Sequence, residues 1–369
     1  MNFDLSDDQK MLAEQANKLL AEVSTPDRLR QLIDEKADYD QVLWQNLAEL
    51  GFLGAAIPEE FGGIGMSAME LAVVAEEVGR YNAAIPFVSS VVQAAKIIEL
   101  AGTQKQKETW LPRIASGEII ATLSTHEGAG DMQSPPLPQC RLDSNGLSGK
   151  KLPVADGHYA HLAVVTCQHQ GKLALALVDL TQDGIQKTQL SSFDELRPFA
   201  QLSFDQTPAE LLELDDCDSQ QALYKTLNYA AAIIALEQIG GTETCLYMAR
   251  DYSLERQIFG RKLGSYQAIK HKLAQVYVKL EIARSNAMYA TWCLANNASD
   301  TGEAIAVSRL SALDAFETAA RENLQVHGGI GYTFEANCHF YYRRERLLAG
   351  LLGGKSLWSD KLINAVKAA

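Results

Sequence analysis

Apolar residues recur at helical spacing over the first third of the chain, from Ser6 to about Ser116. This pattern predicts a series of amphipathic helices. Gly-Phe-Leu-Gly at 51–54 and Pro-Glu-Glu-Phe-Gly-Gly at 58–63 interrupt the pattern and indicate loops. The expected helices are 7–22, 40–50, 67–80, 88–101 and 104–114.

The pattern changes to short runs rich in β-formers between about residues 118 and 214. Turn residues separate the runs, and Asp-Ser-Asn-Gly at 143–146 is a strong hairpin signal. The region is therefore expected to form a small antiparallel barrel or sandwich. Its expected strands are 119–125, 147–154, 161–167, 172–178 and 199–204.

Long helical periods return after residue 218 and predict helices at 219–254, 267–296 and 303–327, then shorter ones near 336–349 and 355–368. Helices of this length are typical of a bundle, often one that builds an oligomer. The order of helices, strands and helices indicates an α+β fold, not the βαβ alternation of a Rossmann fold. We expect three domains, at 1–116, 117–217 and 218–369.

Composition excludes several classes of function. The 369 residues are 47% hydrophobic, which supports a sizeable core, and the net charge of −13 argues against a nucleic-acid partner. No apolar run is long enough for a membrane span, and the N-terminus lacks a secretory leader pattern. The six cysteines form no Cys-x-x-Cys pair, and the seven histidines show no metal-ligand spacing. We expect a soluble, cytoplasmic protein without a metal site.

Two separated motifs carry the most specific signal: Arg-Gln-Ile-Phe-Gly-Arg at 256–261 and Gln-Val-His-Gly-Gly-Ile-Gly-Tyr at 325–332. With Leu-Ala-Glu-Leu-Gly-Phe-Leu-Gly-Ala-Ala-Ile-Pro-Glu-Glu-Phe-Gly-Gly at 47–63, they resemble the acyl-CoA dehydrogenase family over essentially the whole chain. The resemblance implies a helical N-terminal domain, a middle β-barrel and a C-terminal four-helix bundle that forms tetramers. It also implies FAD-dependent α,β-desaturation of an acyl-CoA thioester, with an electron-transfer flavoprotein as acceptor.

The two motifs contain residues suited to the nucleotide end of FAD, which in this family is held by the bundle of a neighbouring subunit. The Arg256 guanidinium matches the geometry of a pyrophosphate, and the Phe259 ring can cover an adenine. Glycines let the backbone approach a cofactor closely. The resemblance adds two polar contacts, so the expected nucleotide-binding residues are Arg256, Phe259, Gln267, Gln325, Gly328 and Gly329.

The residues that should perform the chemistry differ from the family pattern. Desaturation needs a base that removes the α-proton, and the two family positions for this glutamate fall on Leu352 and Ala230. Neither side chain can accept a proton. Glu237, Glu335 and Glu345 are nearby acids that could replace the base, although structural pairing is the more ordinary role for each.

The two loops that contact the flavin ring in the family are also altered. Thr125 and the Gly-Ala-Gly core at 128–130 are retained, but Asp131 and Met132 stand where the family has serine and aspartate. In the second loop Pro153 replaces a tryptophan and Ala155 a threonine, which removes a donor and a hydroxyl. On the acyl-CoA side, the family's aspartate and arginine fall on Asn228 and Ala231.

Three interpretations remain open. The chain is one of two unlike subunits of a heterotetramer acting on a bulky thioester such as a steroid side chain, or a stand-alone homotetramer with a relocated base, or a non-catalytic acyl-CoA-binding scaffold. Retained nucleotide residues beside altered flavin-ring and base positions favour the first. The scaffold interpretation would predict loss of Arg256 and Gln325, and both are present.

Overall fold

The computed structural model describes residues 5–128, 137–212 and 218–368. These residues form two compact units. The bundle unit contains Met1–Leu29, Ala68–Ala83 and Ala231–Ala369, and the sheet unit contains Arg30–Ser67 and Ala84–Ala230. Each unit therefore combines segments that are far apart in the sequence. Within the described residues, no helix is both long and apolar enough to cross a membrane.

Helices make up most of the bundle unit, and several match the periodicity closely. α8 spans Gln267–Asn296, as the pattern predicts, and α1 and α4 differ from their expected ranges by one residue. A Ser6–Gln9 capping box starts α1. The bundle-unit helices are α1 (Asp7–Val23), α4 (Ala68–Arg80), α7 (Ser219–Glu255, which enters this unit at Ala231), α8 (Gln267–Asn296), α9 (Thr301–His327), α10 (Cys338–Leu351) and α11 (Lys355–Ala368).

α4 and α7 pack closely because glycines face the opposite backbone. A Cβ on Gly79 would lie 1.8 Å from the Glu237 carbonyl oxygen, and one on Gly240 would lie 1.9 Å from that of Glu76. No larger residue fits at either position without moving a helix. The two glycines thus set the distance between α4 and α7.

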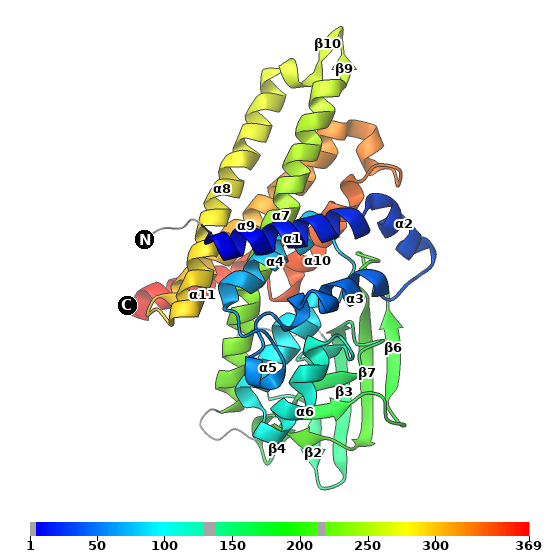
Figure 1. Ribbon diagram of the computed structural model, residues 1–369, viewed down its shortest axis with the longest axis vertical. Coiled ribbons are helices and arrows are strands. Elements are labelled where there is room, and N and C mark those ends of the chain that lie inside the picture. The colour runs from blue at the N-terminus through cyan, green and yellow to red at the C-terminus, as the bar shows by residue number, and fades with distance from the viewer. Residues whose placement is uncertain (1–4, 129–136, 213–217, 369) are drawn as a thin grey trace. The chain divides into compact units, whose positions relative to one another are not determined.

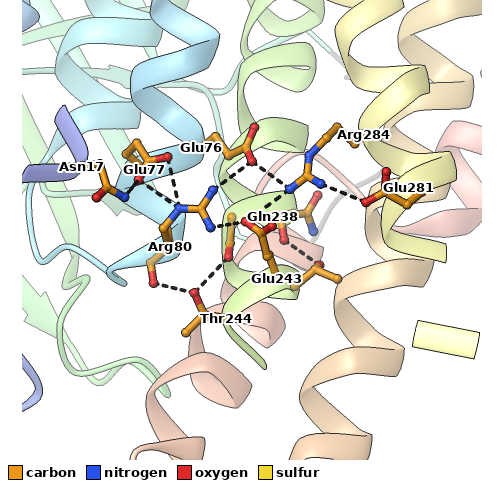
Figure 2. A network of polar contacts seen from close by, with 11 residues as sticks. Asn17, Glu76, Glu77, Arg80, Gln238, Glu243, Thr244, Glu281 and Arg284 are labelled. Atoms are coloured by element: carbon orange, nitrogen blue, oxygen red, sulfur yellow. Dashed lines mark hydrogen bonds and ion pairs between the residues drawn. The ribbon is translucent and has the colours of Figure 1, made fainter. Parts of the chain in front are cut away.

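A network of charged side chains joins α4, α7 and α8 beside this close contact (Figure 2). Arg80 of α4 pairs with Glu243 of α7, and the Thr244 hydroxyl donates a hydrogen bond of 2.8 Å to the Arg80 carbonyl. Burial by itself would lower the pKa of Arg80, but the neighbouring glutamates raise it. The other ion pairs are Arg80–Glu76 at 3.2 Å, Arg80–Glu77 at 2.9 Å, Arg284–Glu76 at 3.0 Å, Arg284–Glu243 at 3.3 Å and Arg284–Glu281 at 3.0 Å.

The sheet unit contains α3 and α6 on the expected segments, but one expected helix is two elements. The periodicity predicts one α-helix over residues 88–101, whereas the structure has the π-helix η3 (Phe87–Ala94) followed by α5 (Ala95–Ala101). A π-turn leaves the apolar pattern of a helix recognisable, so periodicity does not reveal it. The helices are α2 (Pro26–Asp34, which crosses the division between units), α3 (Gln41–Glu49), η1 (Phe52–Gly54), η2 (Glu59–Phe61), η3, α5 and α6 (Gln104–Ala115).

The expectation of an antiparallel β-barrel is wrong. The strands form an open sheet in the order β6-β7-β3-β2-β4-β5-β8, with β1 paired to β4, and β1 and β2 each run parallel to β4. Closure would need the two end strands to pair, but β8 has two residues and β6 has a largely exposed, polar sequence suited to an edge. The strands are β1 (Ala121–Ser124), β2 (Arg141–Asp143), β3 (Gly146–Ala155), β4 (Leu162–His169), β5 (Lys172–Asp179), β6 (Gln186–Leu190), β7 (Phe199–Thr207) and β8 (Glu210–Leu211).

The core of the sheet unit lies between the sheet and its helices (Figure 1). β4 is buried along most of its length and lies between β2 and β5, so its continuous apolar run is that of an inner strand. The expected hairpin at Asp143–Gly146 is confirmed: these residues pair directly, and the Asn145 N–H donates to the Asp143 carboxylate at 2.7 Å. In the core, side chains from β1, β4 and β5 pack against α5 and α6.

Candidate functional site

Arg256 and Phe259 lie at a hairpin that the bundle unit carries beyond the end of α7 (Figure 1). The hairpin consists of β9 (Gln257–Ile258) and β10 (Arg261–Lys262). Phe259 and Gly260 form its turn with φ of 50° and 79°, and two central residues with positive φ characterise a type I′ turn. Positive φ is strained for phenylalanine. The strained turn presents the Phe259 ring with 94% of its surface exposed.

Tyr266 holds this hairpin against the start of α8. Its hydroxyl donates to the Ile258 carbonyl at 2.9 Å, and the Arg261 guanidinium lies 3.8 Å from the centre of its ring. Gln267 follows as the first residue of α8 and is exposed. The Arg256 side chain is exposed and makes no ion pair within the described part of the chain. A permanent cation therefore stands on a fixed hairpin and remains available to an anion.

The second motif lies at the end of α9. Gln325 is exposed in the last turn of this helix, and Gly328, with φ of 64°, starts the turn η5 (Gly328–Tyr332). A Cβ on Gly329 would meet no other atom within 4 Å. The packing of this chain therefore does not require a glycine there, whereas close approach of a ligand to the backbone would.

The structure brings the two motifs together in one small apolar cluster. Val326, from the second motif, packs with Ala249 and Leu263, and Ile258 and Tyr266 of the hairpin region pack against them. The cluster lies within the bundle unit and joins α7, the hairpin, α8 and the end of α9. The cluster thus joins the segments that carry the six expected nucleotide-binding residues, Arg256, Phe259, Gln267, Gln325, Gly328 and Gly329. Sequence analysis did not find Tyr266, which has no motif of its own.

Thr125 belongs to the sheet unit, directly after β1. It is partly buried, and its hydroxyl lies 2.9 Å from Nδ1 of His126. The Gly128 N–H donates to the Leu152 carbonyl at 2.8 Å, which joins the two loops that the resemblance assigns to the flavin ring. Ala129, Gly130, Asp131 and Met132 of the first loop lie outside the described residues.

A buried ion pair that sequence analysis missed supports this loop. Lys151 is fully buried, and its ammonium lies 2.7 Å from Glu127 and 2.9 Å from the Thr166 hydroxyl. The Glu127 carboxylate also accepts the N–H groups of Gln139 and Cys140, at 2.6 and 3.0 Å. Burial alone would raise the pKa of Glu127, but Lys151 and these two donors lower it. The pair is 24 residues apart in sequence, so no local pattern predicts it.

The second loop, at the end of β3, offers no side-chain donor at its two altered positions. Pro153 and Ala155 lie within β3, and the Ala155 carbonyl accepts the Thr122 hydroxyl at 2.8 Å. Asp156, 2% exposed, follows and accepts the hydroxyls of Ser89 at 2.5 Å and Tyr159 at 2.7 Å. This loop is well fixed, but Pro153 and Ala155 themselves have no polar side-chain group for a ligand.

Both family positions for the base are buried and apolar. Leu352 is 4% exposed at the end of α10, and Ala230 is 0% exposed within α7. Asn228 and Ala231 are buried on the same helix as Ala230.

Glu237 and Glu345 each pair with an arginine. Glu237 and Arg344, both 1% exposed, form an ion pair at 3.2 Å. Glu345 pairs with Arg346 at 2.5 Å, and burial raises the pKa of Glu345. Glu335 is exposed. The expected structural pairing is therefore confirmed for Glu237 and Glu345, and neither carboxylate is free of a counter-ion.

Comparisons with known proteins agree with this architecture. The family model "Acyl-CoA dehydrogenase, N-terminal domain" matches residues 6–118, and "Acyl-CoA dehydrogenase, C-terminal domain" matches residues 221–356. The chain is 29% identical over 347 residues to acyl-CoA dehydrogenase IpdE2 of Mycobacterium tuberculosis, covering 94% of this chain and 93% of the relative.

Two solved structures extend the agreement to the fold. A variant of the Tcur3481-Tcur3483 steroid ACAD superposes with a TM-score of 0.88 at 29% identity, covering 98% of both chains. The ChsE4-ChsE5 complex from Mycobacterium tuberculosis superposes with a TM-score of 0.90 at 24% identity, covering 100% of both chains, and at this identity it shows the fold alone.

Proposed function

This chain belongs to the acyl-CoA dehydrogenase family, and we propose that it is the nucleotide-binding subunit of a heterotetrameric, FAD-dependent acyl-CoA dehydrogenase. A second, unlike chain of the family supplies the base. The reaction is the α,β-desaturation of an acyl-CoA thioester, with a bulky acyl group such as a steroid side chain. Support comes from the solved neighbour at 29% identity, whose name pairs two proteins and describes a steroid ACAD. An electron-transfer flavoprotein accepts the electrons.

One observation carries this proposal: the chain displays nucleotide-binding chemistry and has no proton acceptor at either base position. Arg256 and Phe259 are exposed on a fixed hairpin, whereas Leu352 and Ala230 are buried and apolar. A stand-alone enzyme with a relocated base would need another carboxylate, and Glu237 and Glu345 are already paired with arginines. A pair of unlike subunits, one binding the nucleotide and the other supplying the base, accounts for the exposed binding residues and for the missing proton acceptor.

The residues of the bundle unit fit the nucleotide end of FAD. The Arg256 guanidinium pairs with the pyrophosphate, and the exposed Phe259 ring covers the adenine. Gln267 and Gln325 add polar contacts, and at Gly328 and Gly329 the cofactor meets backbone without a Cβ. When bound, FAD supplies the acceptor for the hydride that leaves the β-carbon. Thr125 is the flavin-ring contact that this chain retains.

Exposed apolar side chains on α8 suit a subunit interface. Tyr277, Val278 and Ile282 are 51%, 55% and 54% exposed on adjacent turns of this helix. Apolar groups clustered in this way on a surface mark sites of association. In this proposal the C-terminal segment 218–369 forms the oligomer, after a helical segment at 1–116 and a sheet segment at 117–217.

The test compares two arginines close together in the chain. Arg256→Ala in the assembled enzyme should reduce FAD retention at least tenfold, because loss of a charge-assisted phosphate contact costs about 1.5–3 kcal/mol. Arg250→Ala is the matched control, because Arg250 is an exposed arginine of α7 that pairs with Asp251. FAD is measured by flavin absorbance per chain after gel filtration. Equal retention by both variants would contradict the assignment of the nucleotide site.

A further inference from the structure

α7 and α9 pack in one constant register along the bundle unit. Asn323 donates to the Met248 sulfur at 3.4 Å, and the rings of Tyr252 and His327 stack with centres 4.2 Å apart. Seven residues before Met248 on α7, a Cβ on Gly241 would lie 2.5 Å from the Phe316 ring of α9. The partners in all three contacts are 75 residues apart in sequence. A constant separation means that the two helices run in the same direction, and contact steps of seven and four residues are those of a heptad.

The contact between Tyr252 and His327 lies four residues before Arg256 on α7 and within the second motif on α9. The Arg256 N–H donates to the Tyr252 carbonyl at 2.9 Å, so Arg256 stands one turn beyond Tyr252. His327 is followed at once by Gly328. The constant register therefore makes Arg256 and the Gln325–Gly329 segment emerge at the same end of the helix pair. The two motifs are some seventy residues apart in sequence, and this helix packing brings them close enough to contact one ligand.

His327 is held in one orientation by its own helix. Its Nδ1 lies 2.9 Å from the Asn323 carbonyl oxygen, and because a carbonyl only accepts, Nδ1 carries the hydrogen. Partial burial lowers the pKa of His327, which favours the neutral ring. Tyr252 also packs against the apolar cluster of Ala249, Leu263 and Val326. The stack thus connects the cluster beneath the hairpin to the last turn of α9.

We propose that Tyr252 and His327 are positioning residues that fix the spacing between Arg256 and the Gln325–Gly329 segment. This inference rests on the proposed function, because it assigns these segments to one nucleotide. If the two segments are already held in place before the nucleotide binds, less of the binding free energy is lost in ordering them. His327 belongs to the second motif and Tyr252 lies one turn before Arg256, so the stack sets where the two motifs stand relative to each other.

The first test needs no ligand. Amide hydrogen exchange of the full chain is compared for wild type, Tyr252→Leu, His327→Leu and the ring-preserving Tyr252→Phe. Tyr252→Leu, on α7, should speed exchange at 325–332, at the end of α9 and in η5, and His327→Leu should speed exchange at 256–263. Tyr252→Phe should match wild type, because the ring makes the contact. The control is Trp292→Leu, which removes another aromatic stack, with Tyr289 on α8. If loss of either ring leaves exchange in the opposite motif unchanged, the positioning role is wrong.

The second test measures binding of ADP to the same variants by calorimetry. Removal of either ring should weaken ADP binding about five- to tenfold, as expected for loss of one aromatic stack, while Tyr252→Phe and Trp292→Leu remain within twofold of wild type. If Arg256→Ala weakens binding but the ring variants do not, the positioning role is contradicted and the nucleotide site stands. If wild type binds no ADP, or Arg256→Ala binds it unchanged, the nucleotide site is contradicted, and hydrogen exchange still decides the positioning role.

Discussion

The proposed nucleotide-binding residues and the family base positions of this chain differ in exposure and in polarity. Arg256 and Phe259 are exposed, polar or aromatic, and presented by a strained turn. Leu352 and Ala230 are buried, apolar and unable to exchange a proton. Backbone strain and exposed aromatic surface both cost free energy, and they persist where a ligand or partner uses them. Under the proposed function, this difference means that cofactor binding and proton transfer are assigned to different subunits of one enzyme.

The sheet unit shows the same separation on a smaller scale. Lys151, Glu127 and Asp156 fix the two loops assigned to the flavin ring through buried hydrogen bonds. The positions that would contact a ligand, Pro153 and Ala155, carry no polar side-chain group. The two loops are therefore well fixed, although these two positions offer no polar side chain to a ligand.

The largest expected effect tests whether Glu237 is structural or a relocated base. Arg344→Met should lower the free energy of unfolding by about 3–5 kcal/mol, because it removes the cation 3.2 Å from a carboxylate that is 1% exposed. Urea denaturation measures the change, and Arg250→Met, at an exposed arginine, should change it by less than about 1 kcal/mol.

Turnover separates the two roles of Glu237. We expect Glu237→Gln to destabilise the bundle unit while the assembled enzyme keeps its turnover per folded molecule. A stable Glu237→Gln variant without turnover would instead identify Glu237 as the base and favour the stand-alone enzyme.

A smaller effect on stability is expected from loss of the ion pair between Lys151 and Glu127. Glu127→Gln should lower stability near pH 7 by about 1–3 kcal/mol, the range for hydrogen bonds to a charged group. Because the folded protein lowers the pKa of Glu127 from 4.5, its stabilising contribution is present above that pH and is lost as pH falls through the lowered pKa. The difference in Tm between wild type and variant should therefore shrink below about pH 4.5.

Glu118→Gln is the control for this ion pair, because Glu118 is an exposed glutamate of the sheet unit paired with Arg113. It should change Tm little at any pH. A difference for Glu127→Gln that is as large at pH 3 as at pH 7 would show that the ion pair does not support the loop.

The smallest effect on stability is expected at Phe259. Glycine adopts a positive φ without strain, and the ring is 94% exposed, so Phe259→Gly should change the free energy of unfolding by no more than about 1 kcal/mol. ADP binding should nevertheless weaken about fivefold through loss of the stacking surface, and Phe259→Tyr should restore it. A large loss of stability with unchanged binding would show that Phe259 serves the hairpin and not the nucleotide.

The sequence predicts most of the helical architecture because long amphipathic periods persist in the structure, as in α8 at Gln267–Asn296. It does not predict the polar edge strand β6, whose Gln-Lys-Thr-Gln-Leu sequence lacks alternation, nor the open sheet, which depends on pairing between distant strands. Its motifs indicate the proposed nucleotide-binding residues, but Tyr252, Tyr266 and Lys151 have roles that arise from contacts between distant segments. Spacing within one segment cannot reveal such contacts.

The most direct test of the division between binding and chemistry is the flavin content of this chain purified alone. Absorbance near the flavin band is read against protein concentration, with and without co-expression of a second acyl-CoA dehydrogenase-like chain. The proposal predicts little or no flavin on the chain alone and restored flavin in the co-expressed complex. About one FAD per chain on the protein alone, bleached by an acyl-CoA, would contradict it.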